Sequence, residues 1–324
     1  MNKHLVDRRQ FNTLCATLGL GFSAVSAKVA AQSSASAPAA GFVATSSAAG
    51  RTVKFGDGTL LSAIGQGSWH LGQGRHPAAA EEQALRTGIE LGMTLIDTSG
   101  DYGDGRSEQL IGRAITGQRD HVFLVTKVET NQVSGDGMAH ACDASLARLG
   151  TDYLDLYLLH WPVPSATFSG VVAGFERLRG VGKIRAWGVS NFNVSQMEEL
   201  FRVPDGHRCM TNQVPYSINN RGIERAVLPW CNQHDMPVMA YSPLGGTNNL
   251  VVGDRTLARI GEAHDCSTAA VALAWAIRGG NVIAIPESGS PAHVKENAVA
   301  LSLALTPQEL QTLDAAFPGP SGGN

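Results

Sequence analysis

Three observations predict an α/β protein of the (β/α)8, or TIM, barrel class with an N-terminal β-hairpin closing the bottom. Short β-rich runs alternate with amphipathic helical stretches from Arg51 onward, without a linker or a shift in composition. Such alternation is typical of a parallel sheet covered by helices. Eight units in about 250 residues fit a barrel better than an open sheet. The segment GQGSWHLGQG also matches poorly the glycine fingerprint that an open nucleotide-binding sheet carries after its first strand.

Each expected element follows from its local pattern. Ahead of the first barrel strand, Asp57-Gly58 lies between extended residues, which is a hairpin signal. The expected barrel strands are 61–67, 94–99, 121–128, 153–161, 184–191, 209–216, 237–244 and 281–286. The expected helical stretches are 77–92, 107–115, 137–150, 168–180, 193–201, 222–234 and 254–279, and a further helix is expected to open at Ser290-Pro291.

The first 32 residues have the pattern of an export signal and not of a folded element. Arg8-Arg9 and Phe11 precede a modestly apolar stretch that ends in small residues, which is typical of a twin-arginine signal and predicts a periplasmic protein. The alternative is a charged start to an ordinary amphipathic helix in a cytoplasmic protein. Gly19 and Gly21 argue against membrane insertion, which needs about 20 strongly apolar residues. Residues 33–50 are Ala/Ser-rich and are expected to form a flexible leader, so that 51–324 is the single folded domain.

The composition argues against nucleic acid as a partner. The 324 residues are 43% apolar and 16% charged, with a formal net charge of −3, and no basic cluster suggests nucleic-acid binding. We expect a monomer that binds small molecules. Beyond the signal, the cysteines have no metal-ligand spacing and are expected to be buried thiols; they are Cys142, Cys209, Cys231 and Cys266.

Polar residues gather where the expected strands end, which is where barrel enzymes carry their chemistry. Asp97 and Tyr102 follow strand two, Lys127 ends strand three and His160 closes strand four. Each has a structural alternative: a solvated lysine, a core histidine or a loop-capping aspartate. Together, at the ends of near-continuous apolar runs where an unpaired charge is costly, they indicate a site. A lysine ammonium held by an aspartate favours the phenolate form of a neighbouring tyrosine, and a histidine can orient a carbonyl oxygen. The set predicts proton delivery to an oxygen, without a nucleophile.

The segments around these residues resemble the aldo-keto reductase family. LIDTSGDYGDGRSEQLIG is similar to its strand-two signature, SLARLGTDYLDLYLLHWP to its strand-four signature, and GKIRAWGVSNF and TNQVPYS to the next two. The resemblance runs from about Arg51 to Phe317 and is nearest to bacterial members that include methylglyoxal reductases. It implies reduction of a carbonyl by NADPH or NADH, with Asp97, Tyr102, Lys127 and His160 as the catalytic residues.

The resemblance also implies which residues bind the cofactor. Tyr241 would stack on the nicotinamide, while Ser190, Asn191 and Gln213 would hold its carboxamide. The remaining cofactor contacts implied are Gly67, Ser68, Ser242, Leu244, Glu287, Ser288, His293, Glu296 and Asn297, with Trp69 and Trp161 as walls of the substrate pocket and no metal.

Glu287 and His293 depart from the family pattern. NADPH-preferring members usually carry Lys at the first position and often Arg at the second, where the cations meet the 2′-phosphate. An acid there repels phosphate and can accept a hydrogen bond from a free ribose hydroxyl. We therefore expect weakened NADPH preference, although Lys295 lies close enough in sequence to compensate.

Two other functions stay open at this point. Lys127 could form a Schiff base in an aldolase, or the protein could be a sensor that keeps the cofactor and does little chemistry. The loops 163–170 and 245–254 are short, which favours an open mouth and small aldehydes or dicarbonyls as substrates.

Overall fold

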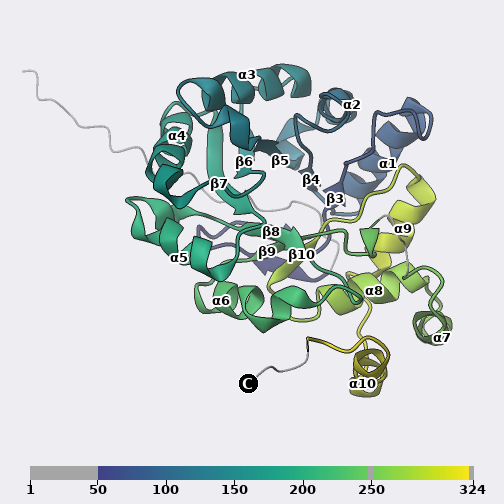
Figure 1. Ribbon diagram of the computed structural model, residues 1–324. Coiled ribbons are helices and arrows are strands. Elements are labelled where there is room, and N and C mark those ends of the chain that lie inside the picture. Colours follow the sequence, from purple (N-terminus) through teal and green to yellow (C-terminus); the bar gives the residue numbers. More distant parts are fainter. Residues whose placement is uncertain (1–49, 247–250, 321–324) are drawn as a thin grey trace, which may run out of the picture. The chain divides into compact units, whose positions relative to one another are not determined.

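Eight parallel strands form the centre of the computed structural model, which describes residues 50–246 and 251–320 (Figure 1). The strands pair in chain order from β3 to β10. Their bounds are β3 (Gln66–Gly67), β4 (Leu95–Asp97), β5 (Phe123–Val128), β6 (Leu154–Leu159), β7 (Ile184–Ser190), β8 (Asn212–Pro215), β9 (Val238–Tyr241) and β10 (Val282–Ala284). All residues of β5 and β6 are buried, as expected for strands covered on both faces.

Hydrogen bonds between the first and last strands close the sheet into the predicted barrel. Gly65 donates its amide N–H to the carbonyl of Ala284 over 2.8 Å, and Gly67 donates to that of Pro286 over 2.9 Å. Bridges between Ile64 and Ala284 and between Gly67 and Glu287 continue the parallel pairing. Glycine is required at position 67, because a Cβ there would lie 2.8 Å from the carbonyl oxygen of Ile285.

The predicted hairpin precedes the barrel. Strand β1 (Thr52–Lys54) pairs antiparallel with β2 (Leu60–Ser62). The Asp57 carboxylate accepts the Thr59 amide N–H over 2.8 Å, and Gly58 has φ of 92°, which favours glycine. The buried Phe55 ring stacks on Phe123, the first residue of β5, with centroids 6.3 Å apart. The hairpin therefore packs at the amino-terminal end of the strands, opposite the expected site.

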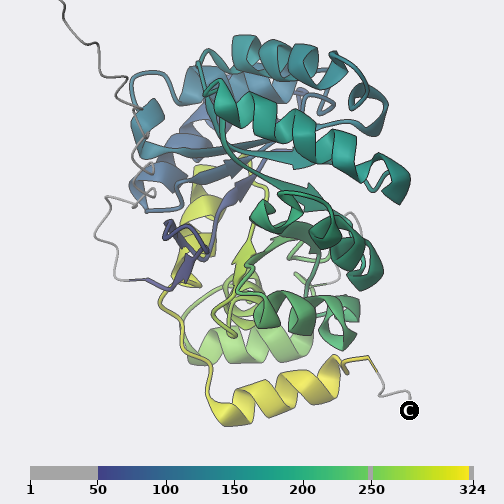
Figure 2. The same cartoon turned by 90° about the vertical axis from the view of Figure 1, so that its left-hand side faces the viewer.

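Helices cover the outside of the barrel, and Figure 2 shows α10 on the outside as well. Their bounds are α1 (Ala78–Glu90), α2 (Arg106–Ala114), α3 (Gly137–Leu149), α4 (Phe168–Gly180), α5 (Val194–Arg202), α6 (Val227–Gln233), α7 (Arg255–Ala263), α8 (Thr268–Ala276), α9 (Pro291–Val299) and α10 (Pro307–Ala316). Short 3-10 turns are η1 (Arg119–His121), η2 (Thr130–Gln132), η3 (Ser165–Thr167), η4 (Gly206–Arg208) and η5 (Gly222–Arg225).

Three expected elements are divided in the structure. The stretch 222–234 forms the 3-10 turn η5 and the helix α6, with Ala226 between them at φ of −145°. The run 61–67 contributes the end of the hairpin strand β2 and the barrel strand β3. The stretch 254–279 forms α7 and α8, because Asp265 takes the left-handed conformation with φ of 51°. Ser267 then caps α8 by accepting the Ala270 amide N–H over 3.2 Å.

Cys142, Cys209 and Cys231 are buried as expected, whereas Cys266 is only partly buried at the α7–α8 corner. None of the helices in residues 50–246 and 251–320 is long and apolar enough to cross a membrane. The expected export signal, 1–32, and the leader up to residue 49 lie outside this part of the chain.

Candidate active site

Three of the four expected catalytic residues form one hydrogen-bonded group at the carboxyl ends of β4 and β5. The Lys127 ammonium donates to Asp97 Oδ2 over 2.7 Å, to the carbonyl of Thr98 over 2.8 Å and to the Tyr102 hydroxyl over 3.1 Å. Its three N–H groups are therefore all used. The exposed fractions of the Lys127 and Asp97 side chains are 0% and 4%, so this ion pair is removed from water.

The buried pair keeps Lys127 charged. Burial alone would lower the lysine pKa, but the charges of Asp97 and Tyr102 and the hydrogen bonds to both outweigh it and raise the pKa. Asp97 is in turn fixed by Gln213, which donates its amide N–H to Oδ1 over 2.7 Å. Gln213, one of the residues expected to hold the nicotinamide, thus also orients the aspartate.

Tyr102 differs from the simplest expectation of a lowered pKa. Burial is the largest influence and raises the pKa of its phenol; Lys127 lowers it, but Asp97 and Glu129 raise it further, so that the net shift is upward. Tyr102 therefore holds its proton at neutral pH, as a proton donor must. The ammonium does favour the phenolate, as expected, but burial of the phenol outweighs it.

His160 faces Tyr102 across the mouth of the barrel. The two rings are 5.9 Å apart between centroids and meet edge to face at 73°. On its other side, His160 Nδ1 hydrogen-bonds to the Glu129 carboxylate. Glu129 was missed by the sequence reasoning, although a residue two positions beyond Lys127 points to the same side of the extended chain.

A second group of expected residues meets beside β7, β8 and β9. The Tyr241 hydroxyl donates to Asn191 Oδ1 over 3.0 Å, and Asn191 Nδ2 donates to the His160 carbonyl over 3.2 Å. Ser190 is buried and donates its hydroxyl to the Gln213 carbonyl over 2.8 Å. Asn191 has φ of 65°, a conformation that asparagine tolerates. The half-buried Tyr241 ring with neighbouring amides fits the flat, hydrogen-bonding nicotinamide.

The expected cofactor contacts Ser68 and Ser242 follow the strands β3 and β9 directly. Ser68 is buried and donates its hydroxyl to the Asp97 carbonyl over 2.8 Å, so it ties β3 to β4. Ser242, which follows β9, has φ of 50° and accepts the Gly245 amide N–H through its carbonyl over 3.0 Å. Leu244 packs partly buried against the core. Residues 247–250 of the following loop are outside the described residues.

Glu287 has partners that the sequence reasoning missed. Its carboxylate accepts the His70 amide N–H over 2.8 Å and contacts His70 Nδ1 over 3.0 Å. Both oxygens are thus bound to the loop between β3 and α1. Glu287 connects the two sides of the barrel closure in addition to any role towards a cofactor.

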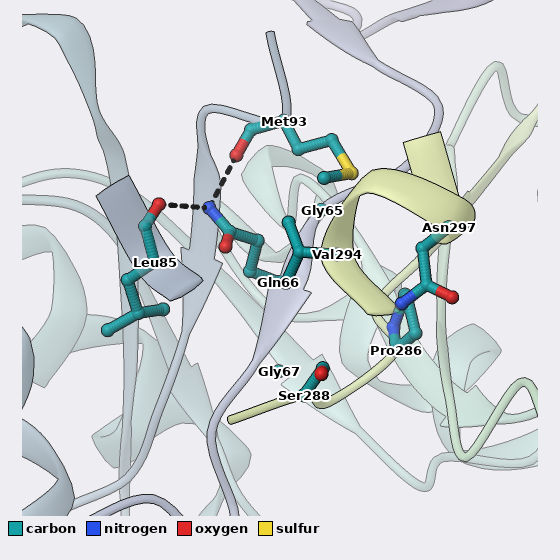
Figure 3. A pocket seen from close by; sticks show the side chains of 9 residues that line it. All are labelled: Gly65, Gln66, Gly67, Leu85, Met93, Pro286, Ser288, Val294 and Asn297. Atoms are coloured by element: carbon teal, nitrogen blue, oxygen red, sulfur yellow. Dashed lines mark hydrogen bonds between the residues drawn. The ribbon is translucent and has the colours of Figure 1, made fainter. Parts of the chain in front are cut away.

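The expected adenosine-end residues lie around the start of α9. Ser290 precedes Pro291, the first residue of the helix, and its amide N–H donates to the Ser288 hydroxyl over 3.1 Å. Ser288 and the buried Asn297 line a cavity of about 10 Å³, which holds one water at most (Figure 3). Gln66, in the same cavity, donates to the carbonyls of Leu85 and Met93. This cavity is too small to hold the cofactor. His293 and Glu296 are exposed on α9.

The two expected pocket walls are large, accessible aromatic rings. Trp69 is 51% exposed and Trp161 is 50% exposed. Trp161 stacks on His160 with centroids 5.9 Å apart, and Trp69 stacks on His70 at 4.4 Å. Rings stacked beside the site and still open to solvent can contact a substrate. In the described residues, no group of three or more His, Cys, Asp or Glu side chains is placed to bind a metal.

Comparisons with known proteins agree with this geometry. The sequence model of the Aldo/keto reductase family matches residues 63–317. The chain belongs to the aldo/keto reductase family. It is 48% identical over 275 residues to the methylglyoxal reductase YeaE of Escherichia coli (strain K12), covering 84% of this chain and 96% of that protein.

Solved structures show the same barrel. The aldo/keto reductase from Klebsiella pneumoniae in complex with NADP and acetate superposes with a TM-score of 0.81 at 43% identity, covering 85% of this chain and 98% of that one. The thermostable aldo-keto reductase Tm1743, in complex with the inhibitor epalrestat, has a TM-score of 0.74 at 34% identity, covering 82% and 98%.

Proposed function

We propose that the protein reduces small aldehydes or dicarbonyls to alcohols with a nicotinamide cofactor. The observation that carries the proposal is the buried Lys127 ammonium, which joins the buried Asp97 carboxylate to the Tyr102 hydroxyl at the barrel mouth. Such a group delivers a proton to an oxygen and offers no free nucleophile. Family membership and the likeness to a methylglyoxal reductase support the same reaction.

In this proposal Tyr102 is the general acid. The reduced nicotinamide, when bound, supplies the hydride to the carbonyl carbon. Tyr102 transfers its phenolic proton to the carbonyl oxygen, and the adjacent Lys127 ammonium stabilises the phenolate left behind. Asp97 keeps the ammonium charged and in place, and His160 lies across from the hydroxyl to orient the carbonyl oxygen.

We assign the cofactor contacts by the same reasoning. Tyr241 would stack on the nicotinamide beside Ser190, Asn191 and Gln213. The helix α9 begins at Pro291 close to Ser288, and the N-terminus of a helix suits an anionic or polar adenosine end. The other proposed contacts are Gly67, Ser68, Ser242, Leu244, Glu287, His293, Glu296 and Asn297.

Cofactor choice is a separate part of the proposal. The Klebsiella pneumoniae relatives were solved with NADP or NADPH. In this chain the positions that would meet a 2′-phosphate hold Glu287 and His293, and Lys295 is the nearby cation. We propose that NADH supports turnover comparably to NADPH. The test is kcat/KM with each cofactor; an NADPH preference above about a hundredfold, or on the order of 3 kcal/mol, contradicts the proposal.

Glu287→Gln makes that comparison sharper. The substitution removes the charge while keeping an oxygen that can accept the His70 amide N–H. If charge weakens NADPH binding, the KM for NADPH falls in this variant and the KM for NADH does not. Equal changes in both would indicate that Glu287 acts only by positioning the loop that contains His70.

The substrate class follows from the site and from the named relative. The exposed Trp69 and Trp161 rings flank the mouth, and the connection between β6 and α4, residues 160–167, is short. Small dicarbonyls such as methylglyoxal fit this arrangement, and a methylglyoxal reductase is among the relatives. A panel of carbonyl compounds, including methylglyoxal and aromatic aldehydes, tests this with each cofactor. Absence of turnover with all of them would favour a cofactor-binding sensor.

The Schiff-base alternative is disfavoured by the environment of Lys127. A lysine must be neutral to attack a carbonyl, whereas all three N–H groups of Lys127 are donated and its pKa is raised by Asp97 and Tyr102 against the effect of burial. Borohydride trapping with an aldehyde should leave Lys127 unmodified.

We also propose that residues 1–32 direct twin-arginine export and that 51–324 is one monomeric reductase domain after the leader 33–50. The paired Arg8-Arg9 and Phe11 support this assignment. The twin-arginine route carries folded proteins, so a cofactor could be bound before export. Cell fractionation and sequencing of the mature N-terminus test it. A periplasmic protein that begins near residue 32 supports the proposal, and an intact cytoplasmic chain contradicts it.

A further inference from the structure

The catalytic histidine has a carboxylate partner that no step of the proposed reaction uses. Glu129 follows β5 directly, and its carboxylate accepts a hydrogen bond from His160 Nδ1. The Ser99 hydroxyl donates to the same carboxylate oxygen over 3.3 Å. These two contacts, from the loops after β4 and β6, hold the acid in place. Its side chain is 25% exposed, so its carboxylate is only partly shielded from solvent.

The contact also fixes which atom of the ring faces the reaction. An ionised carboxylate only accepts hydrogen bonds, so Nδ1 carries the proton and Nε2 is the nitrogen left for other partners. Glu129 therefore lies one imidazole ring away from the place where Tyr102 and His160 would meet a carbonyl oxygen.

Glu129 is charged at neutral pH. Burial raises the pKa of its carboxyl, but the interaction with His160, the hydrogen bond from Ser99 and the charge of Lys127 outweigh burial, and the pKa is lowered. The charge of Glu129 also acts on the proposed acid, because it raises the pKa of the Tyr102 phenol. Burial, Lys127 and Asp97 have larger effects on that pKa.

His160, the direct partner of Glu129, adds a positive charge only when its ring is protonated; with the proton on Nδ1 alone, the negative charge of Glu129 is not cancelled by the neighbouring groups. Lys127 is the nearby cation, but its ammonium is already paired with Asp97 over 2.7 Å. Trp161, the exposed ring on the other side of His160, has no charge. A substrate group that approaches past His160 therefore meets a fixed negative charge.

We propose that Glu129 is a specificity-determining residue, which places a fixed negative charge in the substrate pocket and selects neutral carbonyl compounds over those that carry a carboxylate. The inference rests on the proposed function and deepens it, because it names the substrates that the same site rejects. Dicarbonyls and simple aldehydes are accepted, whereas aldehyde acids and keto acids of similar size are disfavoured. Like charges on opposite sides of one imidazole ring in a partly solvated site are expected to reduce kcat/KM by about tenfold.

The test compares 4-carboxybenzaldehyde with 4-nitrobenzaldehyde, and glyoxylate with methylglyoxal, in the wild type and in Glu129→Gln. Glutamine keeps the shape and an oxygen that can accept from His160 Nδ1 but removes the charge. The measured quantity is the ratio of kcat/KM for the anionic and the neutral substrate, so that intrinsic reactivity cancels between variants. We expect this ratio to rise about tenfold in Glu129→Gln.

Glu198→Gln is the matched control. Glu198 lies on α5 and pairs with Arg202 at 3.8 Å on the outside of the barrel, so the variant changes net charge equally without altering the mouth. Its substrate ratio should equal that of the wild type. A ratio that changes equally in both variants, or in neither, overturns the proposal.

If Glu129→Gln is inactive, a second measurement on the wild type tests the proposal. In the wild type, discrimination against the carboxylate should weaken between 20 mM and 500 mM NaCl, because salt screens a partly exposed charge. Discrimination that does not depend on salt contradicts the proposal. A wild type that reduces no aldehyde refutes the reductase function itself, whereas a wild type that reduces neutral aldehydes with an unchanged ratio in the variant refutes only the role of Glu129.

Discussion

Replacing Lys127 with Met should destabilise the fold as well as abolish activity. Methionine keeps much of the length of lysine but leaves the Asp97 carboxylate, 4% exposed, without its cation. Breaking a buried ion pair in this way typically costs about 3–5 kcal/mol in the free energy of unfolding. Gln213 still donates to Asp97 over 2.7 Å, which places the expected loss near the lower figure, about 3 kcal/mol.

The double variant Asp97→Asn/Lys127→Met separates charge from packing. Asparagine at position 97 has no charge to leave unpaired, so the double variant should recover about 1–3 kcal/mol relative to Lys127→Met. The assay is urea unfolding followed by tryptophan fluorescence and circular dichroism. A loss below about 1 kcal/mol in Lys127→Met, or a double variant less stable than that single variant, would refute the reasoning.

Three further outcomes can be measured on the same preparation. Ser267→Ala removes the cap of α8 and should lower the free energy of unfolding by about 1 kcal/mol without changing KM; an unchanged urea midpoint contradicts this. Burial raises the pKa of the Glu224 carboxyl, but hydrogen bonds from Tyr216, Arg221 and Arg278 outweigh burial, so the pKa is lowered. The stability that the ionised carboxylate contributes is present above its unfolded pKa of about 4.5 and is lost as the pH falls through its lower folded pKa. On acidification below about pH 5, the wild type should therefore lose stability more steeply than Glu224→Gln. Burial raises the pKa of the Cys142 and Cys231 thiols to about 12, so brief iodoacetamide treatment of the native protein at pH 8, mapped by mass spectrometry, should label Cys266 ahead of both.

The barrel was predictable because its signals are local and repeated. Each apolar run that ends in a polar residue marks a strand, and each of the eight expected runs overlaps a barrel strand in the structure. The exceptions have local causes. Asp265 in the left-handed conformation divides a long amphipathic stretch, and the run that begins at Leu61 serves both the hairpin and the barrel.

The proximity of three candidate catalytic residues was predictable from the sequence, whereas their further partners and the shift in the pKa of Tyr102 were not. Strand-end position was enough to bring Asp97, Tyr102 and Lys127 together. The partners Glu129 and His70 were missed because they depend on how loops from distant strands approach, which the sequence does not encode locally. The pKa of Tyr102 rises because burial outweighs the ammonium, and that balance requires three-dimensional packing.

Tyr102→Phe tests the central claim most directly. The variant removes the proposed proton donor and leaves the aromatic ring in place against His160. Loss of general acid catalysis predicts a decrease in kcat for methylglyoxal reduction of about 10²–10⁴-fold. The Kd for NADPH, measured by protein fluorescence quenching, should stay within about threefold of the wild type, because the hydroxyl is assigned to the carbonyl oxygen and not to the cofactor. Retention of wild-type kcat in Tyr102→Phe would contradict the assignment of Tyr102 as the acid.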